Sequence, residues 1–127
     1  MTLILWTGKH GEMLFNHRRC SRDRAVIADI LQTYSPSELC VSAYSASLFA
    51  GARVISDPAD AKTGVLFLED LPLSPALALA NKLILYRFDR VYPADARLQI
   101  PEDFAFTGSR EFAGHSHETI TREVYER

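Results

Sequence analysis

The segment Thr7-Gly8-Lys9-His10-Gly11-Glu12 combines two glycines with an amine, an imidazole and a carboxylate. It follows an apolar run that we predict to be a strand, and ligands of open α/β sheets bind beyond the carboxyl ends of strands. Glycine lets the backbone approach a ligand closely, and the three polar side chains supply charge and a titratable ring. The G-x-x-x-x-G-K-[ST] spacing of a phosphate-binding loop is absent. The segment therefore indicates either a ligand site or a tight turn with solvated polar side chains.

The segment His115-Ser116-His117-Glu118 places two imidazoles next to a carboxylate. A structural zinc site needs four ligands, and His10 and His17 are the only other histidines, so we predict no metal site. Two histidines can also act as general base and general acid, which gives an alternative prediction of a small nuclease or hydrolase. The candidate catalytic residues of that alternative are Lys9, His10, Glu12, His115 and His117. The other interpretation of the segment is a polar helix start with imidazoles on the surface.

Charge is distributed unevenly along the chain. The segment 8–24 has an excess of three positive charges, and the segment 57–70 has an excess of three negative charges when Lys62 is included. The basic side chains of the first segment are Lys9, Arg18, Arg19, Arg22 and Arg24. The acidic side chains of the second are Asp57, Asp60, Glu69 and Asp70. The basic segment could bind phosphate or an acidic partner, and the acidic one could face a basic protein; both could also be ordinary solvated surface.

The segment Tyr86–Pro93 mixes aromatic side chains with alternating charges. Arginine and tyrosine are frequent anchors of protein interfaces because they bury a large area with fixed hydrogen-bond geometry. The candidate interface residues here are Arg87, Asp89, Arg90 and Tyr92. The same arginines and aspartate could instead pair with one another at the tip of a hairpin.

The elements that would position these residues include three short apolar runs, 3–6, 65–68 and 83–86. None of them alternates polar with apolar residues, which predicts strands covered on both faces. We predict a fourth strand at 38–43, although Ser35-Pro36-Ser37-Glu38 also matches a helical capping box. A fifth strand at 96–100 is predicted to form a hairpin with 83–88.

Two helices are predicted from capping and periodicity. The first spans residues 22–34, with Ser21 as its N-cap and an apolar stripe on one face. The second spans residues 117–126, because Glu118–Arg122 and Glu123–Arg127 are spaced as i,i+4 ion pairs. A helical turn at 45–50 and a short helix near 75–81 complete the pattern. The predicted fold is a single domain, residues 1–127, of class α/β or α+β, with a central mixed sheet of about five strands flanked by helices.

Composition restricts the classes of function. The 127 residues include 14 basic and 16 acidic side chains, a balance that argues against a general nucleic-acid binder. No apolar run reaches the length of a membrane span, and the N-terminal apolar run lacks the features of a signal peptide. Cys20 and Cys40 are too few for a disulfide framework, so we expect free thiols in a cytoplasmic protein.

Several of these segments together resemble a group of small bacterial immunity proteins, which accompany contact-dependent growth-inhibition toxins and related polymorphic toxins. The segments are Gly8–Glu12, Ser21–Asp23, Tyr44–Ala46 with Leu48-Phe49, Tyr86–Pro93 and His115–Tyr125. The resemblance implies a cytoplasmic antidote that binds one toxin domain and blocks it. Many such toxins are nucleases, so the resemblance also implies an acidic surface that faces a basic cleft.

The predicted function is therefore that of an immunity protein without catalytic residues, metal or cofactor, whose partner is a cognate toxin. The residues predicted to bind the toxin are Asp57, Asp60, Glu69, Asp70, Arg87, Asp89, Arg90 and Tyr92. The alternatives are the nuclease or hydrolase described above and a small-molecule sensor that uses the Gly8–Gly11 loop.

Overall fold

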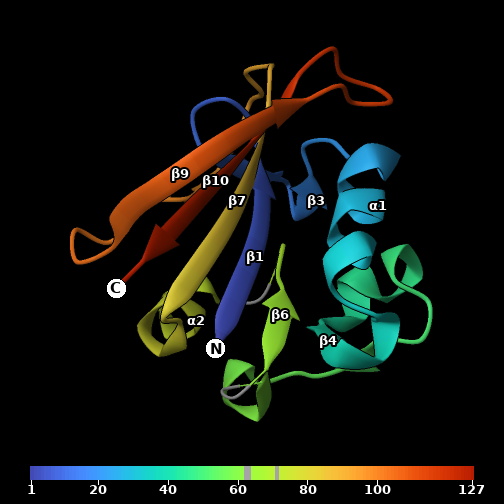
Figure 1. Cartoon of the computed structure of the whole chain (residues 1–127), viewed down its shortest axis with the longest axis vertical. Coiled ribbons are helices and arrows are strands. Elements are labelled where there is room, and N and C mark those ends of the chain that lie inside the picture. Colours follow the sequence, from blue (N-terminus) through green and yellow to red (C-terminus); the bar gives the residue numbers. More distant parts are fainter. Residues whose placement is uncertain (62–63, 71) are drawn as a thin grey trace.

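The computed structural model describes residues 1–61, 64–70 and 72–127. These residues form a seven-stranded mixed sheet with helices on both faces and a smaller three-stranded sheet (Figure 1). In spatial order, the large sheet contains β5 (Arg53–Val54), β4 (Leu39–Val41), β6 (Val65–Phe67), β1 (Thr2–Thr7), β7 (Lys82–Phe88), β10 (Ile120–Glu126) and β9 (Ala105–Phe112). The small sheet contains β3 (Arg18–Arg19), β2 (Glu12–Phe15) and β8 (Ala96–Arg97). The predicted mixed sheet flanked by helices is confirmed, with seven strands where about five were expected.

The helices are short. The described residues contain two α-helices, α1 (Arg24–Thr33) and α2 (Leu73–Leu79), and three 3₁₀-helices, η1 (Pro36–Glu38), η2 (Ala43–Leu48) and η3 (Pro58–Ala61). Within the described part of the chain, no helix has the length and apolar character needed to cross a membrane.

Five strands of the large sheet run parallel to one another: β5, β4, β6, β1 and β7. Strands β10 and β9 extend this sheet in antiparallel fashion. Strand β1 is central, and its Leu3 lies opposite Leu66 of β6 and Leu83 of β7. Because the parallel strands point in one direction, the loops that follow them lie along one edge of the sheet, at the top of Figure 1, which we call the carboxyl edge.

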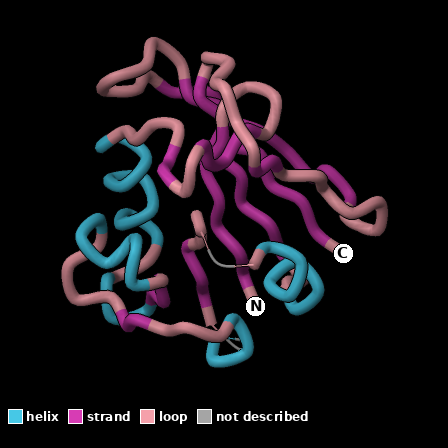
Figure 2. The backbone as a smooth tube through the Cα atoms, turned by 180° about the vertical axis from the view of Figure 1, so that it is seen from behind, coloured by secondary structure: helices cyan, strands magenta, loops and turns pink. Residues whose placement is uncertain are grey.

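The apolar run of β1 supplies both faces of the sheet. Leu3 and Leu5 pack in the core that includes α2, whereas Ile4 and Trp6 pack in the core that includes α1. Successive side chains of a strand point to opposite faces, so a strand buried on both sides must be continuously apolar. Figure 2 shows the result from behind, with α1 and α2 on different sides of the strands. The predicted strands at 3–6, 65–68 and 83–86 are confirmed as β1, β6 and β7.

The ambiguous segment 35–50 contains both of the predicted structures. The capping box of Ser35 and Glu38 is present, but it closes only the single turn of η1. Strand β4 follows directly, and η2 then provides the predicted helical turn. The predicted short helix near residues 75–81 is confirmed as α2, which begins and ends two residues earlier.

Helix α1 confirms the predicted helix at 22–34, but its cap differs. Asp23, not Ser21, is the N-cap, and its carboxylate accepts a hydrogen bond of 2.8 Å from the backbone N–H of Ala25. Val26 and Ile30 are buried and fix the helix on the sheet. The carboxylate is the better cap because its negative charge also interacts favourably with the helix N-terminus.

The helix predicted at residues 117–126 is wrong. Residues 120–126 form strand β10, which lies between β7 and β9. The i,i+4 ion pairs that suggested a helix do not form, since Glu123 pairs with Arg87 at 2.7 Å and Arg127 with Asp103 at 3.0 Å. β-branched and aromatic side chains of this segment favour a strand, and pairing with two neighbouring strands outweighs the local charge pattern.

The hairpin predicted between residues 83–88 and 96–100 is also wrong. Strand β7 pairs with β1 and β10, and β8 pairs instead with β2. Strand β2 itself forms a hairpin with β3 through Asn16 and His17, whose φ angles are 50° and 62°. A two-residue turn with two positive φ angles matches the twist of the flanking strands.

Candidate functional site

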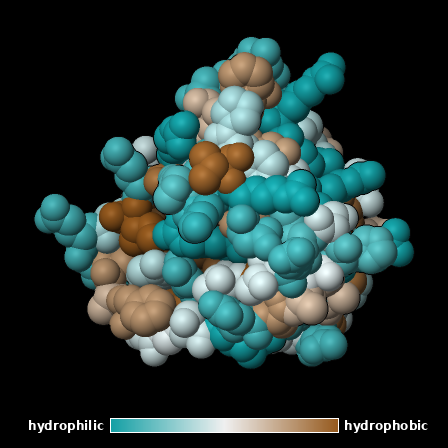
Figure 3. Space-filling model, turned by 90° about the horizontal axis from the view of Figure 1, so that it is seen from above, coloured by the Kyte–Doolittle hydropathy of each residue, from teal (hydrophilic) through white to brown (hydrophobic). Residues whose placement is uncertain are grey.

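Three loops meet at the carboxyl edge of the large sheet. They are residues 8–11 after β1, residues 89–95 after β7, and residues 113–119 between β9 and β10 (Figure 1). Ligands and partners of open parallel sheets bind at this edge, because the loops there can vary while the strands hold them in place. Seen from above, this end of the molecule is mainly hydrophilic, with a few apolar side chains among polar ones (Figure 3).

Glu12 joins two of the loops from the inside. Its side chain is fully buried, and it accepts hydrogen bonds from the backbone N–H groups of His10 at 2.7 Å and of Tyr92 at 2.8 Å. Arg97 lies 3.6 Å away on β8. Burial opposes ionisation of the carboxyl group, but the backbone donors and Arg97 outweigh it, so the pKa of Glu12 is lowered. Glu12 is thus an ionised structural anchor for the loop 8–11 and not an exposed base.

Asp23 anchors the third loop to helix α1. Besides Ala25, its carboxylate accepts hydrogen bonds from the backbone N–H groups of His115, Ser116 and His117, at 2.9, 2.8 and 3.1 Å. The imidazole Nδ1 of His117 lies 2.9 Å from the same carboxylate. Burial of Asp23 acts against ionisation, but the N–H group of His115, the imidazole and the other donors lower its pKa to about 2.

The imidazole of His117 connects Asp23 to the remaining loop. Its Nε2 lies 2.8 Å from the hydroxyl group of Tyr92 and 3.2 Å from Oγ of Ser21. Phe88 at the end of β7 stacks on the ring, with centroids 4.2 Å apart. His117 is buried, so it is part of the interior and not one of two surface imidazoles as its sequence context allowed.

Glu69 is a third buried carboxylate, two residues after the end of β6. It accepts hydrogen bonds from the indole N–H of Trp6 at 2.8 Å, from the guanidinium group of Arg19 at 2.9 and 3.0 Å, and from the hydroxyl group of Ser45 at 2.5 Å. The guanidinium of Arg19 also lies over the ring of Tyr44. This ion pair ties the β2–β3 hairpin to the large sheet.

The network of Glu12, Asp23 and Glu69, which we call the carboxylate network, is fully hydrogen-bonded. Within the described residues, no buried side-chain nitrogen or oxygen atom lacks a hydrogen-bond partner. Buried polar networks of this kind hold a structure rigidly when every member is satisfied. The loops at the carboxyl edge are therefore fixed from below, and only their outward side chains are free to meet a ligand or partner.

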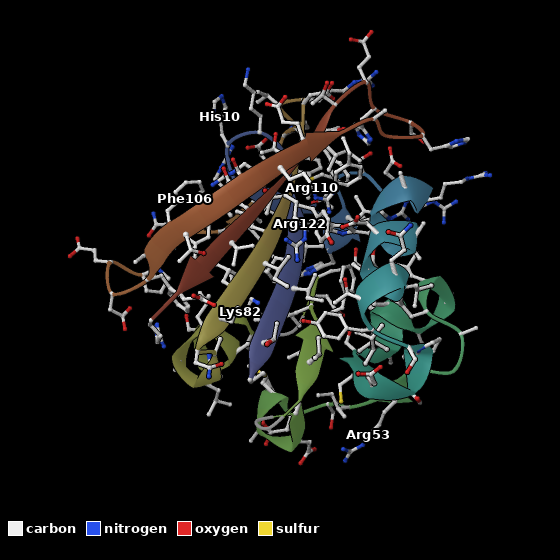
Figure 4. All side chains as sticks on the ribbon, viewed as in Figure 1. His10, Arg53, Lys82, Phe106, Arg110 and Arg122 are labelled. Atoms are coloured by element: carbon white, nitrogen blue, oxygen red, sulfur yellow. The ribbon has the colours of Figure 1, made fainter. Side chains whose placement is uncertain are left out.

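The five candidate catalytic residues are not brought together as a site. Lys9, His10 and His115 are exposed, whereas Glu12 and His117 are buried in separate parts of the carboxylate network. His10 projects from the loop 8–11 at the periphery of the molecule (Figure 4). The described hydrogen bonds do not link the side chain of His10 or of His115 to His117. What the structure assembles around His117 is a different set, Asp23, Ser21 and Tyr92.

The predicted acidic surface at residues 57–70 is wrong as a single patch. Asp57 and Asp60 lie at η3, before β6 begins, whereas Asp70 follows the end of β6. Glu69 is buried against Arg19, and Asp70 accepts a hydrogen bond of 2.5 Å from Ser42. Lys62 lies outside the described residues. The acids are close in sequence, but strand β6 carries the chain from one edge of the sheet to the other between them.

The candidate interface residues at the end of β7 and after it differ in their contacts. Arg87 pairs with Glu123, Asp89 accepts a hydrogen bond from the backbone N–H of Thr119, and Tyr92 bonds His117. Arg90 is exposed, and the neighbouring Val91 is 60% exposed. Sequence reasoning missed Val91, because a single valine in a polar loop gives no signal of its exposure.

The two cysteines are free thiols, as expected. Cys40 is buried in β4, and the thiol of Cys20 lies 3.6 Å from the carbonyl oxygen of Pro93. Burial and the nearby carboxylate of Glu12 raise the pKa of Cys20. The arginines next to Cys20 in sequence therefore do not make it a reactive thiolate.

Gly114 is expected to be essential to the packing of the third loop. A Cβ atom there would lie 2.5 Å from the carbonyl oxygen of His117 and 2.7 Å from Oδ2 of Asp23. Gly114→Ala should therefore lower the free energy of unfolding by about 1–3 kcal/mol, measured by urea denaturation. Gly108→Ala is the matched control, since a Cβ there meets no atom within 4 Å. Equal stability of the two variants would contradict the packing described for this loop.

Acid should weaken the protein through Asp23. The unfolded carboxyl group titrates near 3.8 and the folded one near 2, so between these values the unfolded chain binds more protons and stability falls as the pH falls. The Asp23 contribution, about 2 kcal/mol, is present above pH 3.8 and lost towards pH 2. Urea denaturation at pH 3.8 and at pH 2 measures this change. Between these pH values, the free energy of unfolding should fall less for Asp23→Asn than for the natural chain. An equal loss would contradict a lowered pKa at Asp23.

Compared with known protein families and with curated proteins, the chain matches neither.

Proposed function

We propose that this protein is a binding module that neutralises a cognate bacterial toxin by covering its active site, as immunity proteins do. The observation that carries the proposal is the carboxylate network, which fixes three loops at the carboxyl edge from below. The resemblance of the sequence to immunity proteins of polymorphic toxin systems supports the same function. A toxin that acts inside bacteria would place the protein in the bacterial cytoplasm.

Loops that are fixed before binding favour a tight complex. Ordering a mobile loop in an interface costs free energy, and a loop held in its bound conformation avoids that cost. Here the loops 8–11 and 89–95 are also bonded to each other, since the backbone N–H of Lys9 donates to the carbonyl oxygen of Arg90 at 2.8 Å. The guanidinium group of Arg87 donates to the carbonyl oxygen of Lys9 at 3.3 Å. The two loops therefore present one continuous surface.

We call the outward side chains of this surface, Lys9, His10, Arg90 and Val91, the loop platform. All four are exposed. Arginine is a typical anchor of protein interfaces, and the neighbouring cations favour encounter with an acidic partner. The proposal therefore assigns the toxin an acidic contact surface. It differs in this respect from the expectation that acidic residues 57–70 face a basic cleft.

Co-expression with the polypeptide encoded immediately upstream tests this proposal. We expect that polypeptide to arrest growth when expressed alone, this chain to restore growth, and the two to elute as a one-to-one complex in size-exclusion chromatography. Absence of growth arrest, or arrest that this chain does not relieve, would contradict the proposed function.

A hydrolase is the second candidate, because Asp23, His117 and Ser21 are arranged as in a serine hydrolase. The distance from Asp23 to Nδ1 of His117 is 2.9 Å, and that from Nε2 to Oγ of Ser21 is 3.2 Å. In such a set the histidine takes the proton of the serine hydroxyl as that oxygen attacks an ester carbonyl. Ser21 is only partly buried, as a nucleophile that meets a substrate must be. The hydroxyl group of Tyr92 lies closer to Nε2 of His117 than Ser21 does, and it competes with Ser21 for that nitrogen.

A fluorophosphonate probe separates the two candidates. The hydrolase predicts covalent labelling at Ser21 that is lost in Ser21→Ala and increased in Tyr92→Phe, which removes the competing hydroxyl. The binding module predicts no labelling of the natural chain.

A further inference from the structure

A groove of about 310 Å³ lies beside the start of helix α1, and its lining contains neither a residue of the loop platform nor Ser21, Asp23 or His117. Its lining, which we call the arginine groove, consists of Arg22, Arg24, Ile27, Leu48, His115 and Ser116. Two guanidinium groups, an imidazole and a hydroxyl group thus surround a floor of two aliphatic side chains. None of the lining residues is acidic.

The cations of the groove are available for a ligand. Arg22 and Arg24 are exposed, and the ion pairs found among the described residues do not include either of them. The carboxylate between them in the sequence, that of Asp23, is buried and accepts hydrogen bonds from Ala25 and from the loop 113–119. Its charge is therefore used by internal donors, and the two guanidinium groups face solvent.

The backbone beneath the groove is held in place. The N–H groups of His115 and Ser116 both donate to Asp23, which also caps helix α1 between Arg22 and Arg24. The carboxylate of Asp23 thus fixes the loop 113–119 on one side of the groove relative to the start of helix α1 on the other. A site that is fixed before binding loses little conformational entropy when a ligand arrives.

We propose that the arginine groove binds a phosphate monoester that carries an apolar group. Guanidinium groups form paired, charge-assisted hydrogen bonds with phosphate oxygens, and two of them match a doubly charged phosphate better than a singly charged carboxylate. Ser116 and His115 can donate to the remaining oxygens. Ile27 and Leu48 provide contact for the apolar part of the ligand, such as an aromatic ring. The source of the phosphate is a small metabolite or a phosphorylated tyrosine of a protein.

Calorimetric titration with phenyl phosphate tests the proposal on the whole chain. We expect phenyl phosphate to bind at least about tenfold more tightly than inorganic phosphate, which lacks the ring. We expect the same difference from phenylacetate, which has the ring but only one negative charge. The double variant Arg22→Ala/Arg24→Ala should lose this binding by at least tenfold. The matched control is Arg53→Ala/Lys82→Ala, which removes two cations elsewhere on the molecule (Figure 4).

A phosphotyrosine peptide forms the second arm of the experiment. Tighter binding of the peptide than of phenyl phosphate assigns a protein source, and the reverse order assigns a small molecule; either result supports the groove. The proposal is overturned if phenyl phosphate does not bind, if it binds no better than phenylacetate, or if the two double variants bind it equally. None of these outcomes depends on a toxin partner.

Discussion

Asp23→Ala is expected to lower the free energy of unfolding by about 3–5 kcal/mol. The variant removes the acceptor of four backbone N–H groups and of the His117 imidazole. Buried donors that lose their acceptor retain the cost of desolvation without its compensation. Urea denaturation at neutral pH measures the change.

Two further variants make the Asp23 result specific. Asp23→Asn keeps the shape and one acceptor oxygen of the side chain, so it should fall between the natural chain and Asp23→Ala. Asp60→Ala removes an exposed carboxylate and should change stability by less than about 0.5 kcal/mol. If Asp23→Ala were as stable as Asp60→Ala, the carboxylate network could not be what holds the loop 113–119.

Glu69→Ala is expected to have a similar effect, again about 3–5 kcal/mol. It leaves the indole N–H of Trp6 and the hydroxyl group of Ser45 buried without their acceptor, and it leaves Arg19 without its ion pair. Trp6 is the only tryptophan and is 3% exposed, so its fluorescence reports both unfolding and the local change. The emission spectrum of the folded variant should differ from that of the natural chain.

The control for Glu69→Ala is Glu102→Ala, at an exposed glutamate on the surface. It should leave both stability and the fluorescence of Trp6 unchanged. Should Glu69→Ala give the same denaturation midpoint as this control, the proposed connection between the β2–β3 hairpin and the large sheet would be refuted.

The central strands were predictable because their cause is local. A strand covered on both faces must be continuously apolar, and β1, β6 and β7 show this directly in the sequence. Strand β10 was not predictable in the same way. Its alternating charges fit a helix when considered alone, and only its two neighbours, β7 and β9, satisfy its backbone as a strand. Information of that kind is carried by distant parts of the chain.

The position of the candidate site could be predicted from the sequence, but the residues that hold it together could not. The loop 8–11 lies at the carboxyl edge as expected, since its place follows from the strand before it. Asp23 and Glu69 bind side chains that lie far from them in the sequence. Asp23 contacts His117, and Glu69 pairs with Arg19. An acid next to a helix start was the one available signal for Asp23. No local pattern marks Glu69 as buried.

The affinity of the loop platform for the proposed toxin partner tests the central claim most directly. We would compare the natural chain with Lys9→Glu/Arg90→Glu/Val91→Asp by calorimetry against the polypeptide encoded upstream, the proposed toxin. The matched control is Arg53→Glu/Lys82→Glu, which reverses two cations away from the platform. We predict that the platform variant binds at least about tenfold more weakly than the natural chain at unchanged stability, while the control binds as the natural chain does. Equal affinity of the platform variant and the natural chain would contradict the claim.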